Sequence, residues 1–553
     1  MALLIDIFGY LTVILGGLAI TAQAFTVGGI IFVLLLVTPL RGALGALADT
    51  ILARSLRIIL VSALALAVVE TLTALAQIAI LVDTTGIDLS EALGAGFVRA
   101  GALRIAAALV IAVLSLRAPR RLAWANAARV VAALTLIVGA VLTSHAVARL
   151  DDRVPLAVVT ALHQLGAAIW IGGLPCFVMA LASCTDGRAC SLIGRRYSLM
   201  SMAGVAILLG AGIGLAVVYI DSLEALYGTA YGAMVTGKIC MFLGLLMLGA
   251  LNYRLVERLR ADPSTPITRL WRCAEVEIGI GITVFFAAAS LTSLPPAADL
   301  TVDRVSLTEI VDRLEPRWPP RLESPDHASL ALSQLQDQLS ASAANAPNRP
   351  QAFVPGAGVV PPRNAEDIAW SEYNHHWSGL LVLAIGLLAL AERTGRAPWA
   401  RHWPLIFLLL AVFLFFRSDP ETWPLGQEGF WESLRDPEVA QHRVFVVLIV
   451  AFAIFEWRVR TGRARSPRAA YVFPLLTATG GLLLLTHSHA LANIKDELLI
   501  EWTHLPLALL GITAGWARWL ELRLDPPQRW IPAWIWPICF TLIGPLLLFY
   551  REI

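Results

Sequence analysis

Fourteen long apolar runs dominate this chain of 553 residues. A helix needs about 20 mostly apolar residues to cross the hydrocarbon core of a bilayer, and 58% of the residues here are hydrophobic. Because lipid offers no hydrogen-bond partners to the backbone, such runs cross the membrane as helices. The sequence therefore predicts an all-α polytopic membrane protein. We place the spans near residues 7–40, 57–82, 102–116, 124–146, 155–183, 198–221, 231–253, 275–294, 377–391, 403–416, 442–459, 470–490, 501–520 and 531–550.

The distribution of basic residues predicts the orientation. Short cytoplasmic loops retain Lys and Arg, and alternate loops of this topology hold most of the 42 basic residues. Those loops are 41–57, 117–129, 184–197, 254–274, 392–402, 457–469 and 518–530. Both termini should therefore face outward. No positive charge precedes Arg41, which favours a retained first helix over a cleaved signal peptide. We expect a multi-pass protein in the lipid bilayer of a bacterial inner (plasma) membrane.

The apolar runs fall into two blocks. Residues 1–296 hold eight spans and residues 373–553 hold six, so we expect an eight-helix and a six-helix bundle. Between them, residues 297–372 are rich in Pro, Ala and Ser, which is typical of a linker. We expect this linker to rest on the outer surface. Its part near 326–345 has the apolar spacing of a short amphipathic helix.

Several classes of function are excluded. The formal net charge is only +2, and the basic clusters are explained by topology, so we expect no nucleic-acid partner. The glycines of 210–214 resemble a nucleotide-binding loop, but they lie inside an apolar run with no preceding strand, which favours helix packing. No Walker-type loop or phosphorylation motif is present. We therefore expect no coupling to ATP and no enzymatic activity.

The histidines indicate a metal site. Of the ten histidines, all except His402 fall at or near the predicted outer boundary of the membrane. Imidazole binds copper well, whereas thioether and thiolate groups favour Cu(I). In the second block, imidazoles from four spans reach a similar depth, which predicts a metal or haem site there. The candidate ligands in this block are His375, His376, His442, His487, His489 and His504.

The fifth span carries the most specific motif, the stretch from Leu162 to Leu174. His163, Gly166 and Trp170 share one helix face. This face therefore carries an imidazole, a small residue that allows close helix packing, and an indole. A histidine inside a bilayer span is costly without a partner and is a site candidate. His145, at the end of the fourth span, is the second candidate ligand of this block.

Four motifs in order resemble the CopD family of bacterial inner-membrane copper proteins, over roughly residues 1–296. They are His145-Ala146 with the 163–174 stretch, Tyr227-Gly228 followed by Lys238, the 249–254 stretch, and Glu275 leading to the 291–296 stretch. The resemblance implies a role in copper uptake or tolerance. It also implies a periplasmic CopC-like copper donor, which would be a separate protein because no such domain is fused here. No family is recognised in the six-helix block.

Softer ligands lie deeper in the first block. A pathway for copper could run through Cys176, Met179, Met234, Cys240 and Met241, with Trp170 beside it. Met and Cys are also ordinary core residues, so packing alone is the alternative reading. Glu70 lies in the middle of the second span. It could form an ion pair with Arg104 or Lys238, or it could belong to a proton path.

These observations favour transport of copper across the inner membrane, with uptake from the periplasmic side through histidine sites. Two alternatives stay open. Pairs of histidines on facing helices also bind haem b in membrane cytochromes. A copper chaperone or assembly scaffold could bind the ion at the outer surface without moving it across.

Overall fold

The computed structural model describes Leu4 and residues 7–116, 123–149, 152–344, 363–486 and 495–552. Fourteen of its helices are long and apolar enough to cross a membrane, and each matches one predicted span. Among the described residues there is no β-strand, only an isolated bridge between Thr422 and Glu428. The prediction of an all-α polytopic membrane protein is confirmed.

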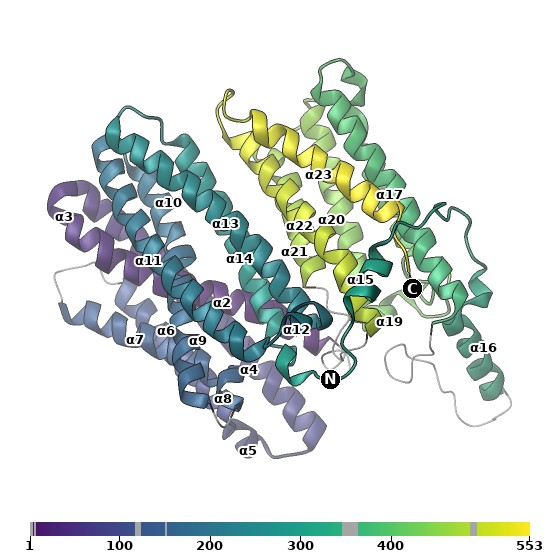
Figure 1. Ribbon diagram of the computed structural model, residues 1–553. Coiled ribbons are helices and arrows are strands. Elements are labelled where there is room, and N and C mark those ends of the chain that lie inside the picture. Colours follow the sequence, from purple (N-terminus) through teal and green to yellow (C-terminus); the bar gives the residue numbers. More distant parts are fainter. Residues whose placement is uncertain are drawn as a thin grey trace. The chain divides into compact units, whose positions relative to one another are not determined.

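The chain forms two compact units, residues 1–302 and 303–553. Figure 1 colours the first from purple to teal and the second from green to yellow. The described part of the segment that we expected to be a linker contains structure. It forms α15 (Leu307–Leu314), the short turn η4 (His327–Ser329) and α16 (Ala331–Ala344), all within the second unit. The expected amphipathic helix near 326–345 is present as α16.

The first unit contains eight spanning segments. They are α2 (Phe8–Phe32), which continues through the π-turn η1 (Val33–Val37) into α3 (Thr38–Leu44); α4 (Ala46–Thr85); α6 (Gly96–Leu116); α7 (Ala123–Leu142); α9 (Arg153–Ala167), which continues through the π-turn η2 (Ala168–Gly172) into α10 (Leu174–Ser183); α11 (Gly187–Tyr219); α13 (Ala230–Ala261); and α14 (Thr268–Leu291). Short elements join them: α5 (Leu89–Leu93), α8 (His145–Ala148), α12 (Leu223–Gly228) and η3 (Ala297–Asp299).

Helix α2 is the centre of the first unit and packs against α4, α14 and η2. The approach between α2 and η2 is a backbone contact. A Cβ added to Gly28 would lie 2.2 Å from the Ala168 carbonyl oxygen, and one added to Gly172 would lie 2.0 Å from the Ala24 carbonyl oxygen. Small residues allow such close crossings, from which helices in lipid gain most of their packing energy.

The π-turn η2 exposes the backbone carbonyl of Trp170. Pro175 follows in the first turn of α10 and has no N–H to donate to the preceding turn. The hydroxyl of Tyr197, on α11, donates to the Trp170 carbonyl over 2.6 Å instead. Tyr197 also stacks on Phe177 with ring centroids 4.3 Å apart. These contacts hold the bulge in place, and π-bulges of this kind are frequent at functional sites.

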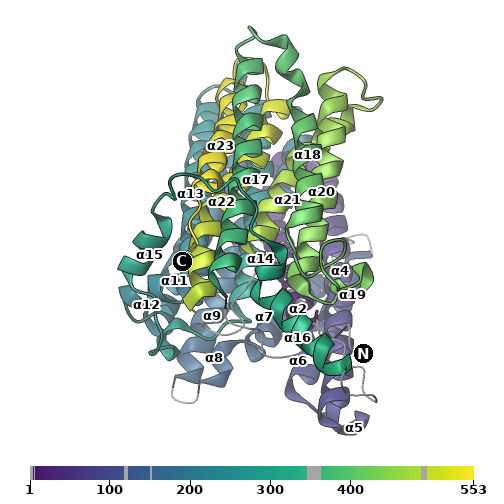
Figure 2. The same ribbon diagram turned by 90° about the vertical axis from the view of Figure 1, so that its right-hand side faces the viewer.

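The second unit contains six spanning segments, which run side by side in Figure 2. They are α17 (Ala365–Arg393); η5 (Pro398–Leu405) with α18 (Ile406–Arg417); α20 (Pro437–Arg460); η6 (Pro467–Tyr471) with α21 (Val472–Leu485); α22 (Lys495–Arg523); and α23 (Trp530–Leu548). The short helix α19 (Phe430–Ser433) lies between α18 and α20 in the sequence. Helix α17 packs closely on α23, and α21 on α22.

Two features stabilise the end of this second bundle where α17 ends and η5 begins. An aromatic core forms around Trp403, whose ring contacts those of Phe473 and Trp536. Next to it, charged side chains of α17, α20 and α22 neutralise one another in a buried network. Its ion pairs are Arg460 with Glu392 and Glu456, Arg518 with Glu456 and Glu521, and Arg393 with Glu521. Such pairing is what makes buried charge tolerable in a low-dielectric environment.

The crossing of α2 and η2 gives a first prediction. Replacing Gly28 with Ala should destabilise the protein by about 1–3 kcal/mol, because the new methyl group meets backbone atoms that cannot rotate away. A Cβ added to Gly210 on α11 would meet no atom of a neighbouring helix within 4 Å, so Gly210→Ala is the matched control and should be neutral. Thermal unfolding in detergent measures both. Equal stability of the two variants would contradict the backbone contact.

Candidate functional site

The described histidines of the second unit, apart from His402, gather at one end of it. This histidine end comprises the start of α17, the end of α18, the starts of α20 and α22, and the segment after α23. It contains His327, His375, His376, His442 and His504. His402 lies at the opposite end, where the Trp457 indole donates to its Nδ1 over 3.0 Å. His487 and His489 lie outside the described residues.

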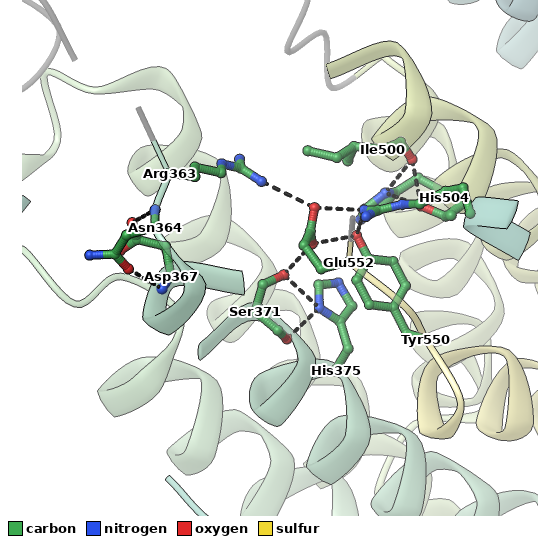
Figure 3. Close-up of polar contacts among 11 residues, drawn as sticks. Arg363, Asn364, Asp367, Ser371, His375, Ile500, His504, Tyr550 and Glu552 are labelled. Atoms are coloured by element: carbon green, nitrogen blue, oxygen red, sulfur yellow. Dashed lines mark hydrogen bonds and ion pairs between the residues drawn. The ribbon is translucent and has the colours of Figure 1, made fainter. Parts of the chain in front are cut away.

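Two imidazoles at the histidine end form a close pair. His375 on α17 and His504 on α22 have ring centroids 5.9 Å apart, with the ring planes at 77°. Figure 3 shows both rings with Tyr550 and Glu552 beside them. Both histidines are half-buried. The sequence predicted that these histidines share a depth; the structure adds that their rings are neighbours.

Each ring of this pair is oriented by its own helix. His375 Nδ1 lies 2.8 Å from the carbonyl oxygen of Ser371, and His504 Nδ1 lies 2.8 Å from that of Ile500. A carbonyl oxygen only accepts, so in both rings Nδ1 carries the proton and donates. The lone pair is then on Nε2. This is the tautomer that binds metal through Nε2, with a second hydrogen bond that holds the ring.

The segment after α23 covers one face of the pair. The ring of Tyr550 stacks on that of His375, with centroids 3.8 Å apart and planes at 14°. Glu552 accepts from Ser371 over 2.6 Å and from the Tyr550 hydroxyl over 2.9 Å. It also pairs with Arg313 of α15 at 2.7 Å. These contacts tie the end of the chain to α15 and α17.

The charges around Glu552 set its ionisation state. Burial opposes the ionised form, but Arg313, the hydrogen bond from Ser371, and Arg363 together lower the pKa of Glu552 below its ordinary value. Burial raises the pKa of the Tyr550 hydroxyl, and the negative charge of Glu552 adds to this effect. The carboxylate is therefore ionised and the phenol neutral beside the histidine pair at neutral pH.

His376 and His442 have other partners. The Arg321 amide donates to His376 Nδ1 over 2.6 Å, and His376 Nε2 donates to the Tyr550 carbonyl over 2.7 Å. Both nitrogens of this fully buried ring are engaged by backbone, which fits a structural role. His442 Nδ1 lies 2.5 Å from Asp419 Oδ1. A metal-ligand role for these two residues remains a prediction.

Acidic residues surround the His442 region. Burial, with the nearby charge of Asp419, raises the pKa of Glu421 to about 8. Burial, with the charge of Asp436, raises the pKa of Glu428 to about 7. Among the described residues, however, no group of three or more His, Cys, Asp or Glu side chains is arranged to hold a metal ion. A site of three protein ligands is therefore not preformed in the described part of the chain.

In the first unit, His163 and His145 have different surroundings. His163 Nδ1 lies 3.2 Å from the Leu208 carbonyl oxygen of α11, and its ring lies against Gly212. His145, at the start of α8, has a buried Nε2 without a hydrogen-bond partner among the described residues. No contact joins these two histidines into one site within the described residues.

The proposed path of soft ligands is only partly enclosed by the first unit. Cys176 is fully buried, and Met234 and Met241 are also buried. Cys240 is exposed on the surface of α13 although its neighbour Met241 is buried, so the two side chains face in different directions. Met179 is half-buried, and its sulfur lies 3.7 Å from the Ser183 hydroxyl. The path remains a prediction.

Glu70 pairs with Arg104, one of the two partners that we considered. The ion pair is 2.7 Å long and buried. Arg104 also donates to Gln23 over 3.0 Å, and Gln23 donates to Gln164, the neighbour of His163, over 3.1 Å. A polar chain thus connects α4, α6, α2 and α9.

The partners of the histidine pair were not predicted from the sequence. Tyr550, Glu552 and Arg313 carry no local signal, because a tyrosine and a carboxylate after a last span are ordinary interface residues. Glu277, a further buried residue, was also not predicted, and its partner Asn252 was named only as part of the 249–254 stretch. An intramembrane carboxylate is itself a signal, and Glu277 could have been found in this way.

Glu552 gives a prediction of pH dependence. Its folded-state pKa is below the unfolded value of about 4.3, so its ionisation stabilises the fold above that pH, and the contribution is lost as the pH falls through the folded value. Glu552→Gln should cost about 2–4 kcal/mol at pH 7 and less at pH 3.5. Unfolding midpoints at the two pH values measure this.

Glu315, in an exposed pair with Arg551, is the control, and Glu315→Gln should have almost no effect. A pH-independent loss in Glu552→Gln would contradict this role of the carboxylate.

Comparison with known proteins identifies part of the first unit. Residues 192–291, which include α12, α13 and α14, match the family model described as Copper resistance protein D. A stretch of 163 residues, 29% of this chain, is 30% identical to the copper transport protein CutJ of Bacillus subtilis (strain 168). The match covers 29% of that protein's length, well under two thirds. No solved structure matches the chain. The resemblance that the motifs indicated is confirmed over residues 192–291, which lie in the first unit of this polytopic membrane protein.

Proposed function

We propose that this protein transports copper ions across the bacterial inner membrane, taking them up from the periplasmic side. Three findings support the proposal: the match to Copper resistance protein D, the similarity to a protein named as a copper transport protein, and fourteen spans. The distribution of basic loops favours an outward-facing histidine end of the second unit. Copper would therefore meet these imidazoles at the periplasmic side.

The observation that carries the proposal is the geometry of His375 and His504. Two rings that share one ion through Nε2, at metal–nitrogen distances of about 2.0 Å, have centroids roughly 5–6 Å apart, depending on the angle at the metal. The observed separation is 5.9 Å. Both rings have the tautomer that presents a lone pair at Nε2. Two imidazoles at a wide nitrogen–metal–nitrogen angle suit Cu(I). Additional water or carboxylate ligands suit Cu(II).

His163 is the proposed copper ligand of the first unit. Its Nδ1 is held by the Leu208 carbonyl, so it also presents Nε2, and it lies on the same span as Cys176 and Met179. The order imidazole, thiol, thioether along this span follows the preference of Cu(I) for softer ligands. A separate periplasmic CopC-like protein would deliver the ion, as the family resemblance implies.

Haem b is the competing occupant of the histidine pair. One observation disfavours it: the face of His375 is covered by Tyr550 at a centroid distance of 3.8 Å. A porphyrin ligated by His375 would extend several ångströms around Nε2, and Tyr550 restricts the room on that face of the ring. A scaffold that binds copper without moving it remains the second alternative, and vesicle transport distinguishes it from a transporter.

The experiment measures copper bound to the purified protein and copper accumulated by proteoliposomes. The double variant His375→Ala/His504→Ala should lose about tenfold or more in copper affinity, and uptake should fall with it. His402→Ala is the matched control, since this histidine lies at the other end of the unit, and it should bind and transport like the wild type.

Three results would overturn the proposal. Unchanged copper affinity in the double variant would remove the histidine pair as a ligand set. A Soret band in the purified protein that is lost in the double variant would assign the pair to haem. Copper binding without any accumulation in vesicles would favour the scaffold.

A further inference from the structure

Glu277 on α14 is a buried carboxyl group that the proposed copper path does not use. Only 2% of the residue is exposed. The Asn252 amide of α13 donates to its Oε1, and the Trp170 side chain of the π-turn η2 is a second hydrogen-bond partner. Three separate elements of the first unit therefore converge on one carboxyl group.

This carboxyl group lacks a counter-charge. Within the described residues no Lys, Arg or His side chain forms an ion pair with Glu277. Glu70, another buried carboxyl group in the spans of the first unit, pairs with Arg104 at 2.7 Å. An unpaired carboxylate in a membrane interior is costly. Glu277 therefore favours binding of a positive charge, whereas Glu70 is already neutralised.

The neighbouring amide indicates which positive charge fits. Asn252 is 8% exposed, and its Oδ1 is buried without a hydrogen-bond donor among the described residues. A protonated carboxyl group gains one O–H donor, and an amide offers N–H donors and one oxygen acceptor. Protonation of Glu277 therefore supplies the donor that Asn252 Oδ1 lacks, while Asn252 Nδ2 still donates to Glu277 Oε1.

The position of Glu277 suits a group that binds and releases a proton inside the membrane. Glu277 lies nine residues after the start of α14 at Thr268, about 14 Å along the helix axis. Trp170 lies near the middle of the span Arg153–Ser183. Both lie well inside their spans, far from either end, and the π-turn beside them is a local irregularity of the kind that functional helices use.

We propose that Glu277 is a reversible proton-binding site that couples proton movement to copper movement, with Asn252 as the acceptor that stabilises the protonated form. In one cycle the carboxylate takes one proton from one side of the membrane and releases it to the other, and no other bond is made or broken. The coupling rests on the proposed copper transport. The proton site does not, because it follows from the burial and hydrogen bonding of this chain alone.

Infrared spectroscopy of the purified full-length protein tests the proton site without copper. A protonated carboxylic acid has a carbonyl band that a carboxylate lacks. Glu421 and Glu428 also have raised pKa values, so the measurement uses a Glu421→Gln/Glu428→Gln background. This background protein should show a buried band at neutral pH, and adding Glu277→Gln should remove it. Glu277→Asp, which keeps a carboxyl group, should retain a band at a shifted frequency. Glu70→Gln is the matched control and should leave the band unchanged, because its carboxylate is paired.

Two infrared results would overturn the site. The first is a background protein without the band, or a band that persists after Glu277→Gln is added to it. The second is loss of the band when sodium replaces potassium in the buffer, which would assign the carboxylate to a sodium ion. Glu277→Asp is the control for folding. If this variant keeps a band, loss of the band in Glu277→Gln reports the missing carboxyl group and not a misfolded protein.

Proteoliposomes with a pH-sensitive dye inside test the coupling. Added copper should produce a proton signal in the wild type, and Glu277→Gln should lose that signal while its copper affinity stays within about twofold of the wild type. A proton signal that persists in Glu277→Gln overturns the coupling. A wild type that moves no copper overturns both the coupling and the proposed function, whereas the infrared band then still decides whether Glu277 binds a proton.

Discussion

The cost of burying charge away from water is the constraint on which this structure depends. An isolated ion in a low-dielectric interior is strongly destabilising unless it is paired or neutralised. The spans nevertheless contain the buried side chains of Glu70, Arg104, Glu456, Arg518 and Glu521. All of these are paired within their own unit. The pairs also tie helices together, since Glu456 and Arg518 come from α20 and α22. Charge neutralisation therefore holds neighbouring helices together and also lowers the cost of burying these charges.

The groups of functional interest differ from these ion pairs. Glu277 has hydrogen-bond partners but no cation among the described residues, and the rings of His375 and His504 lie next to each other. Each group is suited to take up a positive ion: a proton at the carboxyl, a copper ion at the imidazoles. The two cargoes need different ligand sets: a pair of imidazole nitrogens binds copper, whereas one carboxyl group beside an amide binds a proton.

The sequence predicts the spans well and the site contacts less well, for a physical reason. Hydropathy along the chain is a local property, so all fourteen spans were found. The places of His375, His442 and His504 near the starts of their spans followed from the same pattern. Which rings meet depends on helix rotation and on distant segments. The pair of His375 with His504 and the cover by Tyr550 are of this kind. Glu275 and Glu277 show the same limit: two residues apart, Glu275 pairs with Arg272 at 2.5 Å while Glu277 faces Asn252.

X-ray absorption spectroscopy of the copper-loaded protein decides whether the two paired imidazoles bind the ion. We expect nitrogen scatterers at about 2.0 Å with the outer-shell pattern of two imidazoles, lost when His375 and His504 are replaced by Ala. A copper centre with sulfur ligands alone and no imidazole pattern would contradict the histidine pair as the copper site.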